Sequence, residues 1–148
     1  MVTLPPFQDL YALYISFSNM TGWSSDSNSA ITLPDSLTSL RIRYSNLTSV
    51  PTLLARVPPN LVYLRLEGAP ITTFPDAYIH AWANVPSIIL NDNLTEIQAL
   101  ATRTATLEWL ELGGNGIRSI PTQCSKQVDY LQYLDLSANA LTEDRVAS

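Results

Sequence analysis

Few side chains in the sequence could act as nucleophiles, general acids or metal ligands. The chain has one histidine, His80, and one cysteine, Cys124. A catalytic histidine needs a nucleophile and an orienting acid beside it, and a zinc site needs three or four ligands. One histidine and one cysteine complete neither set. We therefore expect His80 to be a surface residue and Cys124 to be an inert, partly buried thiol, and we predict no metal and no cofactor.

Two further segments have the residue types of an active site without the required context. The segment 113–116, Gly-Gly-Asn-Gly, is rich in glycine. A phosphate-binding loop would need a Lys-Ser or Lys-Thr pair after it, and none follows. Glu108 and Glu111 are a carboxylate pair of the kind that glycosidases use, but they fall on one predicted strand with no evident cleft. The sequence predicts a turn, a solvated strand and no enzyme.

Apolar residues recur at a spacing that fits neither a helix nor a long strand. In LEWLELGGNGIRSIP, residues 107–121, they lie at offsets 0, 3, 5, 10 and 13. Units with this pattern start near residues 10, 37, 61, 85, 107 and 131, which is a spacing of 22 to 27 residues. The unit at 85 needs a one-residue deletion before Leu94. A composition with 46% apolar residues would satisfy fewer than half of these positions by chance, so the repeat is real.

The shared pattern, L-x-x-L-x-L-x-x-N-x-L-x-x-I-P, closely resembles that of the leucine-rich repeat family, whose period lies in this range. The resemblance extends over about residues 10–141. It implies an α/β solenoid of about six repeats, in which the chain forms a curved right-handed coil. Parallel strands would line the concave face, and short helices or irregular turns would form the convex face.

Each unit is predicted to begin with a short strand, x-L-x-L-x. Side chains alternate across a strand, so Leu110 and Leu112 should point into the core while Glu111 points outward. One unit cannot bury its own apolar edge, and stacking with its neighbours makes a continuous core. The chain then turns and returns along the other side, which brings offsets 10 and 13 into the same core.

The residue at offset 8 lies where the family builds a ladder of buried asparagines. There a side-chain amide bonds backbone groups that the turn leaves unpaired. Serine at this offset could do part of the same work, but alanine could not. We therefore expect a backbone adjustment or a bound water in the third unit. In chain order the ladder position holds Ser18, Ser45, Ala69, Asn93, Asn115 and Asn139.

The return segments are predicted to be mixed. Residues 76–83 follow Pro75 and should form a short helix that starts at Asp76. Thr95 and Gln98 have the spacing of a capping box, which predicts a second helix over residues 95–101. Three prolines between residues 51 and 59 predict an irregular segment or a single turn there.

Length and charge limit the class of protein. A chain of 148 residues predicts a single domain, residues 1–148. The net charge of −5 argues against a nucleic-acid partner, and no apolar run is long enough to span a membrane. The first unit starts by residue 10 and the sixth does not finish its return. We therefore expect incomplete caps at both ends and a fragment of a longer array.

Sequons and composition indicate an extracellular or cell-surface location, with the cytoplasm as the alternative. The N-x-S/T acceptors are Asn19, Asn46 and Asn93. Asn19 and Asn46 should be exposed one place past the ladder and are the predicted glycosylation sites, whereas Asn93 should be buried and unmodified. Lysine occurs once, at Lys126, and the single cysteine excludes an internal disulfide.

The outward residues of the predicted strands form a candidate binding face. Its N-terminal half is basic, its C-terminal half is acidic, with Asp92 and Glu108 counted among the acids, and aromatic residues are interleaved. Tyrosine, tryptophan and arginine are enriched in interface hot spots, although aromatics also pack across strands and surface charges can simply pair in solvent. The candidate residues are Tyr14, Arg41, Arg43, Tyr44, Tyr63, Arg65, Trp109, Glu111, Tyr133 and Asp135.

The resemblance implies a non-catalytic recognition module that binds a protein or peptide on this concave face. Its N-G-x-x-x-[IL]-P turns and its sequons are similar to extracellular repeats of receptor-like kinases, which predicts a receptor-like or secreted protein. No kinase motif occurs, so any kinase domain would lie outside this chain. Two alternatives stay open at this point: an intracellular scaffold or adaptor, and a structural spacer in a longer repeat array.

Overall fold

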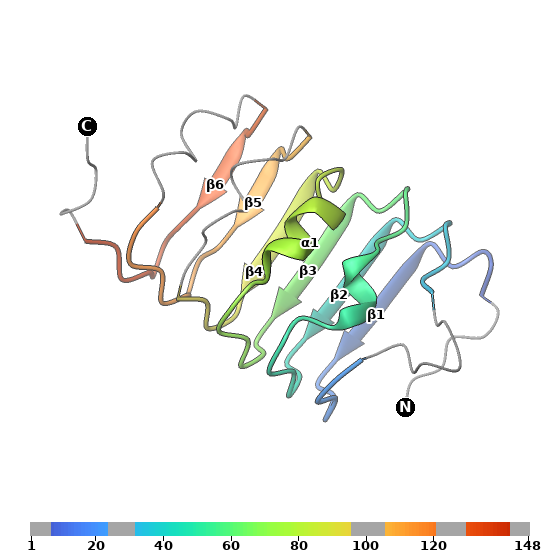
Figure 1. Cartoon of the computed structure of the whole chain (residues 1–148), viewed down its shortest axis with the longest axis horizontal. Coiled ribbons are helices and arrows are strands. Elements are labelled where there is room, and N and C mark those ends of the chain that lie inside the picture. Colours follow the sequence, from blue (N-terminus) through green and yellow to red (C-terminus); the bar gives the residue numbers. More distant parts are fainter. Residues whose placement is uncertain (1–6, 24–31, 96–105, 121–129, 143–148) are drawn as a thin grey trace.

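The structure is a computed structural model, and it describes residues 7–23, 32–95, 106–120 and 130–142. One six-stranded sheet runs through it, with the strands side by side in chain order (Figure 1). Every neighbouring pair is parallel. The strands are β1 (Ala12–Ser16), β2 (Ser39–Arg43), β3 (Tyr63–Glu67), β4 (Ser87–Asn91), β5 (Trp109–Glu111) and β6 (Tyr133–Asp135). The fold is a parallel-strand β-solenoid, and the predicted parallel stacking is confirmed.

The strand register aligns the same sequence offset in every neighbouring pair. Leu40 of β2 lies opposite Leu64 of β3, and Leu64 lies opposite Ile88 of β4. Leu110 of β5 lies opposite Leu134 of β6 in the same row. Because a slip of one residue would turn each strand's leucines toward solvent, burial of this row fixes the register.

The hydrophobic core lies along one side of the sheet and is best closed over its middle strands. Leu40, Leu64 and Leu112 have no exposed surface, and burial of each such side chain contributes about 1.5–3 kcal/mol. Burial falls toward both ends of the sheet. Leu13 of β1 is only partly buried, and Leu134 of β6 is 48% exposed.

Short helical segments cover the core side of β2–β4. The 3-10 helix η1 (Thr52–Ala55) and the α-helix α1 (Asp76–Ala81) lie on the same face of the sheet (Figure 1). Both fit the sequence predictions, although α1 ends two residues earlier than expected. His80 on α1 is exposed, as predicted. The helix predicted over residues 95–101 falls almost entirely outside the described residues, as does Cys124.

Aromatic side chains join the two helical segments to the core. The Tyr78 hydroxyl donates to the Val50 carbonyl at 3.1 Å, and Trp82 Nε1 donates to the Leu54 carbonyl at 2.8 Å. Both acceptors lie in or just before η1. The ring of Phe74 meets that of Trp82 edge to face, with centroids 4.7 Å apart. The polar tips of the two buried aromatics are therefore satisfied, as most buried polar groups in proteins are.

The turns after the strands share one backbone conformation, with a single exception. A residue with positive φ directly follows β1, β2 and β3 and recurs at the same offset in the turns after β5 and β6. These residues are Phe17 (53°), Tyr44 (52°), Gly68 (68°), Gly114 (72°) and Ala138 (53°). The turn after β4 lacks such a residue, because the one-residue deletion of this unit falls there and Asp92 follows the strand directly.

This deletion overturns the prediction for the fourth ladder position. Asp92, and not Asn93, fills it: Asp92 is 6% exposed, whereas Asn93 is exposed. Asp92 Oδ1 accepts the Ala69 backbone N–H at 2.7 Å. The carboxylate therefore satisfies the alanine-bearing third turn, where the sequence had suggested a backbone adjustment or a bound water.

The two C-terminal asparagines form the predicted ladder. Asn115 Nδ2 donates to the Leu90 and Leu112 carbonyls at 2.7 and 2.8 Å. Its Oδ1 accepts the Leu94 N–H at 2.9 Å and the Asp92 N–H at 3.2 Å. Asn139 repeats the arrangement. Its Oδ1 accepts the Ile117 N–H of the preceding unit, and its Nδ2 donates to the Leu112 and Leu136 carbonyls, with a longer contact to that of Ser137. Each amide thereby ties two successive turns together.

The prediction for the two serines is wrong. Ser18 Oγ and Ser45 Oγ are buried and make no hydrogen bond. A hydroxyl is shorter than an amide and has one donor where the amide has two. In these turns the backbone pairs with itself: Phe17 N–H donates to the Arg43 carbonyl at 3.0 Å, and Ser18 N–H donates to the Tyr44 carbonyl at 3.2 Å.

Candidate functional site

The candidate site is the strand face, which we define as the outward side chains of β1–β6 together with Phe17 and Tyr44 in the first two turns. The alternation of β2 and β3 places their leucines and Ile42 in the core and their other side chains on this face. Nine of the ten predicted binding residues lie on strands at outward positions. The tenth, Tyr44, directly follows β2 in the left-handed turn.

Arg41 lies between two tyrosine rings on neighbouring strands. Its Cζ is 4.6 Å from the centroid of Tyr14 on β1 and 4.6 Å from that of Tyr63 on β3. Such cation–π contacts hold a guanidinium in place while leaving its charge unneutralised. Arg41 Nε is buried without a hydrogen-bond partner, and within the described part of the chain no acid forms an ion pair with Arg41.

The other two arginines of this half are held by one carboxylate. Arg43 Nε and Arg65 Nε lie 2.8 and 2.6 Å from Glu67 Oε2. Burial by itself would raise the pKa of Glu67, but the hydrogen bonds from the two arginines outweigh it and hold the pKa below its usual value. The alternative reading, in which surface charges of this face pair with each other, therefore holds for Arg43 and Arg65 and not for Arg41.

Aromatic residues border this cluster at the turn edge. The rings of Phe17 and Tyr44 stack with centroids 4.8 Å apart, and the Tyr44 hydroxyl donates to Glu67 Oε1 at 3.3 Å. The Tyr44 ring also lies over Gly68, where an added Cβ would come within 2.5 Å of it. Phe17, 81% exposed, was not among the predicted site residues. Its position at the same offset as Tyr44 was the signal that could have identified it.

The C-terminal half of the strand face carries the opposite charge. The rings of Trp109 and Tyr133 stack at 3.8 Å with an interplanar angle of 8°, and Trp109 Nε1 donates to Glu111 Oε1 at 2.8 Å. Glu111 lies opposite Asp135 in the register of β5 and β6. Hydrogen bonds from Ser137 lower the pKa of Asp135. Neither acid has an ion pair with another described residue.

Strand β4 separates the two halves with uncharged side chains. Its outward residues are Ser87, Ile89 and Asn91. Ile89 is only 3% exposed and lies in register between Arg65 of β3 and Glu111 of β5. Asp92, which the sequence placed among the acids of this face, is buried in the turn ladder instead. The acidic half therefore rests on Glu111 and Asp135, with Glu108 exposed just before β5.

The predicted glycosylation sites, Asn19 and Asn46, are both exposed. Asn93 is exposed as well, so the prediction that burial would keep it from being glycosylated is wrong.

Among the residues that the structure describes, no three His, Cys, Asp or Glu side chains gather as metal ligands. No described helix has the length and apolar character needed to cross a membrane. No family model matches the chain, and no curated protein matches its sequence.

Proposed function

We propose that this chain is a leucine-rich repeat protein of about six repeats and that it is a non-catalytic module that binds a protein or peptide through the strand face. Three features support the family: the recurring offsets in the sequence, the parallel register of equivalent leucines, and the asparagine ladder at Asn115 and Asn139. Each of them could arise in another solenoid, but together they fit this repeat best.

The observation that carries the binding role is the state of Arg41. An arginine held between Tyr14 and Tyr63 without a counter-charge keeps both its charge and its geometry available to a partner. Arginine and tyrosine are among the residue types that dominate binding energies at interfaces. Trp109 and Tyr133 supply a second aromatic anchor toward the other end of the sheet.

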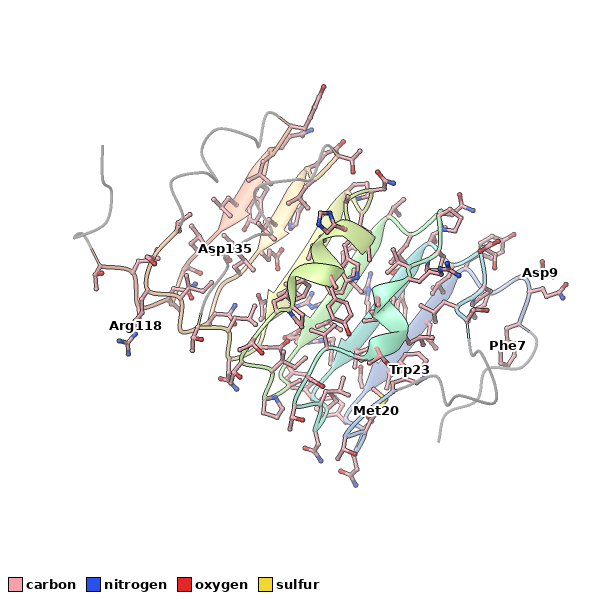
Figure 2. The ribbon with its side chains drawn as sticks, viewed as in Figure 1. Phe7, Asp9, Met20, Trp23, Arg118 and Asp135 are labelled. Atoms are coloured by element: carbon pink, nitrogen blue, oxygen red, sulfur yellow. The ribbon has the colours of Figure 1, made fainter. Side chains whose placement is uncertain are left out.

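A capture experiment with matched variants tests this role. The double variant Arg41→Glu/Trp109→Ala removes one anchor from each half of the strand face. The control Arg118→Glu/Tyr130→Ala makes the same kinds of change at exposed residues outside the strands; Arg118 projects from the turn edge of the sheet (Figure 2). We expect proteins retained by the native chain and by the control to be lost from the face variant. Identical capture by all three, with native circular dichroism, would contradict the proposal.

We further propose that the chain acts outside the cell, as part of a receptor-like or secreted protein. The exposed sequons at Asn19 and Asn46 support this location. After secretion from eukaryotic cells, treatment with an N-glycosidase should reduce the mass of the native chain but not that of an Asn19→Gln/Asn46→Gln variant. Good folding in the cytosol, with no glycan after secretion, would favour the intracellular scaffold.

A structural spacer is the second candidate, and one observation favours it. Several face residues already satisfy one another: Glu67 binds Arg43 and Arg65, and Trp109 stacks on Tyr133. A face whose residues mainly stabilise the sheet needs no partner. The spacer predicts that the face variant loses stability and loses no captured protein.

A further inference from the structure

Like charges lie opposite each other at two places on the strand face. Arg41 pairs in register with Arg65, and Glu111 pairs with Asp135. Like charges directly opposite each other destabilise a sheet. Glu67 neutralises Arg65, but among the described residues nothing neutralises Arg41 at one end or the two acids at the other.

The two ends also differ from ordinary surface charges in how they are held. Arg41 is fixed by its two tyrosine rings, and Glu111 is fixed by the hydrogen bond from Trp109 Nε1. Immobilised side chains lose less conformational entropy when a partner binds. A guanidinium is well matched to a carboxylate, which it binds with two parallel hydrogen bonds. Two charged groups with fixed positions can therefore select a partner by the spacing of its charges.

The distance between these groups follows from the sheet. Three strand spacings separate β2 from β5, which is about 14 Å at about 4.8 Å for each spacing. An extended peptide that crosses the strands advances about 3.3 Å for each residue, so this distance corresponds to about four residues. Strand β4, between the ends, offers Ser87, Ile89 and Asn91 and no charge that would oppose either end.

We propose that the strand face binds an extended segment of a partner protein that carries an acidic and a basic side chain about four residues apart. The acidic side chain binds Arg41, and the basic side chain binds Glu111, beside which Asp135 lies in register on the next strand. This inference rests on the proposed function, because it specifies the partner of the same face. It adds a charge pattern and a spacing that the partner must have.

Two synthetic peptides of identical composition test the spacing. In acetyl-Glu-Ser-Ser-Ser-Lys-amide the charges are four residues apart, and in acetyl-Ser-Glu-Lys-Ser-Ser-amide they are adjacent. Binding is followed by NMR of the ¹⁵N-labelled full chain at low ionic strength. Arg41 Nε–H reports on the basic end, and Trp109 Nε1–H, which donates to Glu111, reports on the acidic end. We expect the spaced peptide to shift both signals and to bind about tenfold more tightly, because its second contact forms within the same complex.

Single charge changes separate the two ends. Arg41→Gln and Glu111→Gln should each reduce the affinity for the spaced peptide to that of its isomer, and Glu111→Gln keeps an acceptor for Trp109. Replacing the peptide's glutamate with glutamine should have the same effect as Arg41→Gln and requires no change to the protein. Arg118→Gln changes the net charge by the same amount as Arg41→Gln, but at a residue outside the strands. It should leave the affinity for the spaced peptide unchanged.

The outcomes distinguish this inference from the proposed function. Equal binding of the two peptides, or an equal loss with Arg118→Gln, would show that only net charge matters and would overturn the spacing rule. If the Arg41→Glu/Trp109→Ala variant then still loses its captured protein, the recognition role stands with a different partner chemistry. If neither peptide shifts a signal and capture is also unchanged, both proposals fail.

Discussion

Two pairs of turns reverse the chain with the same backbone conformation: those after β1 and β2, and those after β5 and β6. The two pairs differ in the side chains that bond their backbone N–H and carbonyl groups. In both pairs a backbone N–H of one turn donates to a carbonyl of the next, as Phe17 does to Arg43 and Gly114 does to Ser137. In the first pair the buried serine hydroxyls bond nothing. In the second pair, Asn115 and Asn139 bond two turns each through their side chains. The parallel register is the same in both halves, so burial of the leucine rows sets the register, and the ladder adds stability to turns already formed.

The largest effect that separates the two kinds of turn is expected from Asn115→Ala. This change removes the side-chain partner of the Leu90 carbonyl and of the Asp92 and Leu94 N–H groups, whereas the Leu112 carbonyl keeps its hydrogen bond from Asn139 Nδ2. Each buried unsatisfied group costs about 1–3 kcal/mol, and with partial rearrangement we expect a loss of about 3–5 kcal/mol in the free energy of unfolding. Ser45→Ala is the matched control. Because Ser45 Oγ is buried without a partner, its removal should not destabilise the chain and should raise the free energy of unfolding by about 1 kcal/mol.

Urea unfolding followed by tryptophan fluorescence, to which the buried Trp23 and Trp82 contribute, would measure both variants. Equal losses for Asn115→Ala and Ser45→Ala would mean that the ladder amide contributes no more than an unpaired hydroxyl. The difference between the asparagine-bearing and the serine-bearing turns would then make no difference to stability.

Between the two kinds of turn lies Asp92, an acceptor that cannot donate while it is ionised. Burial raises its pKa to about 6, against the lowering effect of the hydrogen bond from Ala69, and the nearby charge of Glu67 raises the pKa further. The pKa in the folded chain exceeds the ordinary value of 3.8. The carboxyl's contribution to stability is therefore fully present below pH 3.8 and is lost as the pH rises through about 6.

Asp92→Asn should remove this pH dependence and provide the two donors that Asn115 has. We expect the variant to be more stable than the native chain by about 2–3 kcal/mol at pH 8 and by much less at pH 4. The measurement is the difference in unfolding free energy between variant and native chain at pH 4, 6 and 8. Asp135→Asn should show the opposite sign, because hydrogen bonds from Ser137 lower the pKa of Asp135 in the folded chain. A difference for Asp92→Asn that does not change with pH would contradict the raised pKa.

The sequence predicted the strands, their register and the outward residues well, because each depends on local alternation. Leu110, Glu111 and Leu112 alternate within three residues, so the face of each follows from its neighbours. The ladder residue of the fourth turn could not be predicted in this way. A one-residue deletion beside Asp92 and Asn93 can be placed on either side of the ladder position, and only the pairing of the Ala69 N–H with Asp92 decides between them.

The arrangement of charges on the strand face was also beyond the sequence. Glu67 lies opposite Arg43 in the register and two residues from Arg65, and it binds both. Arg41 lies between tyrosines from two other strands. Which arginine is neutralised depends on side-chain conformations across three strands. The composition of the face was therefore predictable, and the state of each charge was not.

The smallest effect tests the left-handed residue that both kinds of turn share. Gly68 and Gly114 have φ of 68° and 72°, but a Cβ at Gly68 would lie 2.5 Å from the Tyr44 ring, whereas a Cβ at Gly114 would meet nothing within 4 Å. A left-handed conformation costs a non-glycine residue about 1–2 kcal/mol, so Gly114→Ala should lose about 1 kcal/mol. Gly68→Ala should lose about 1 kcal/mol more, because the ring must also move. In a Tyr44→Ala background the two losses should become equal. If the difference between the glycines persists there, its origin lies in the backbone of the third turn and not in the aromatic residue above it.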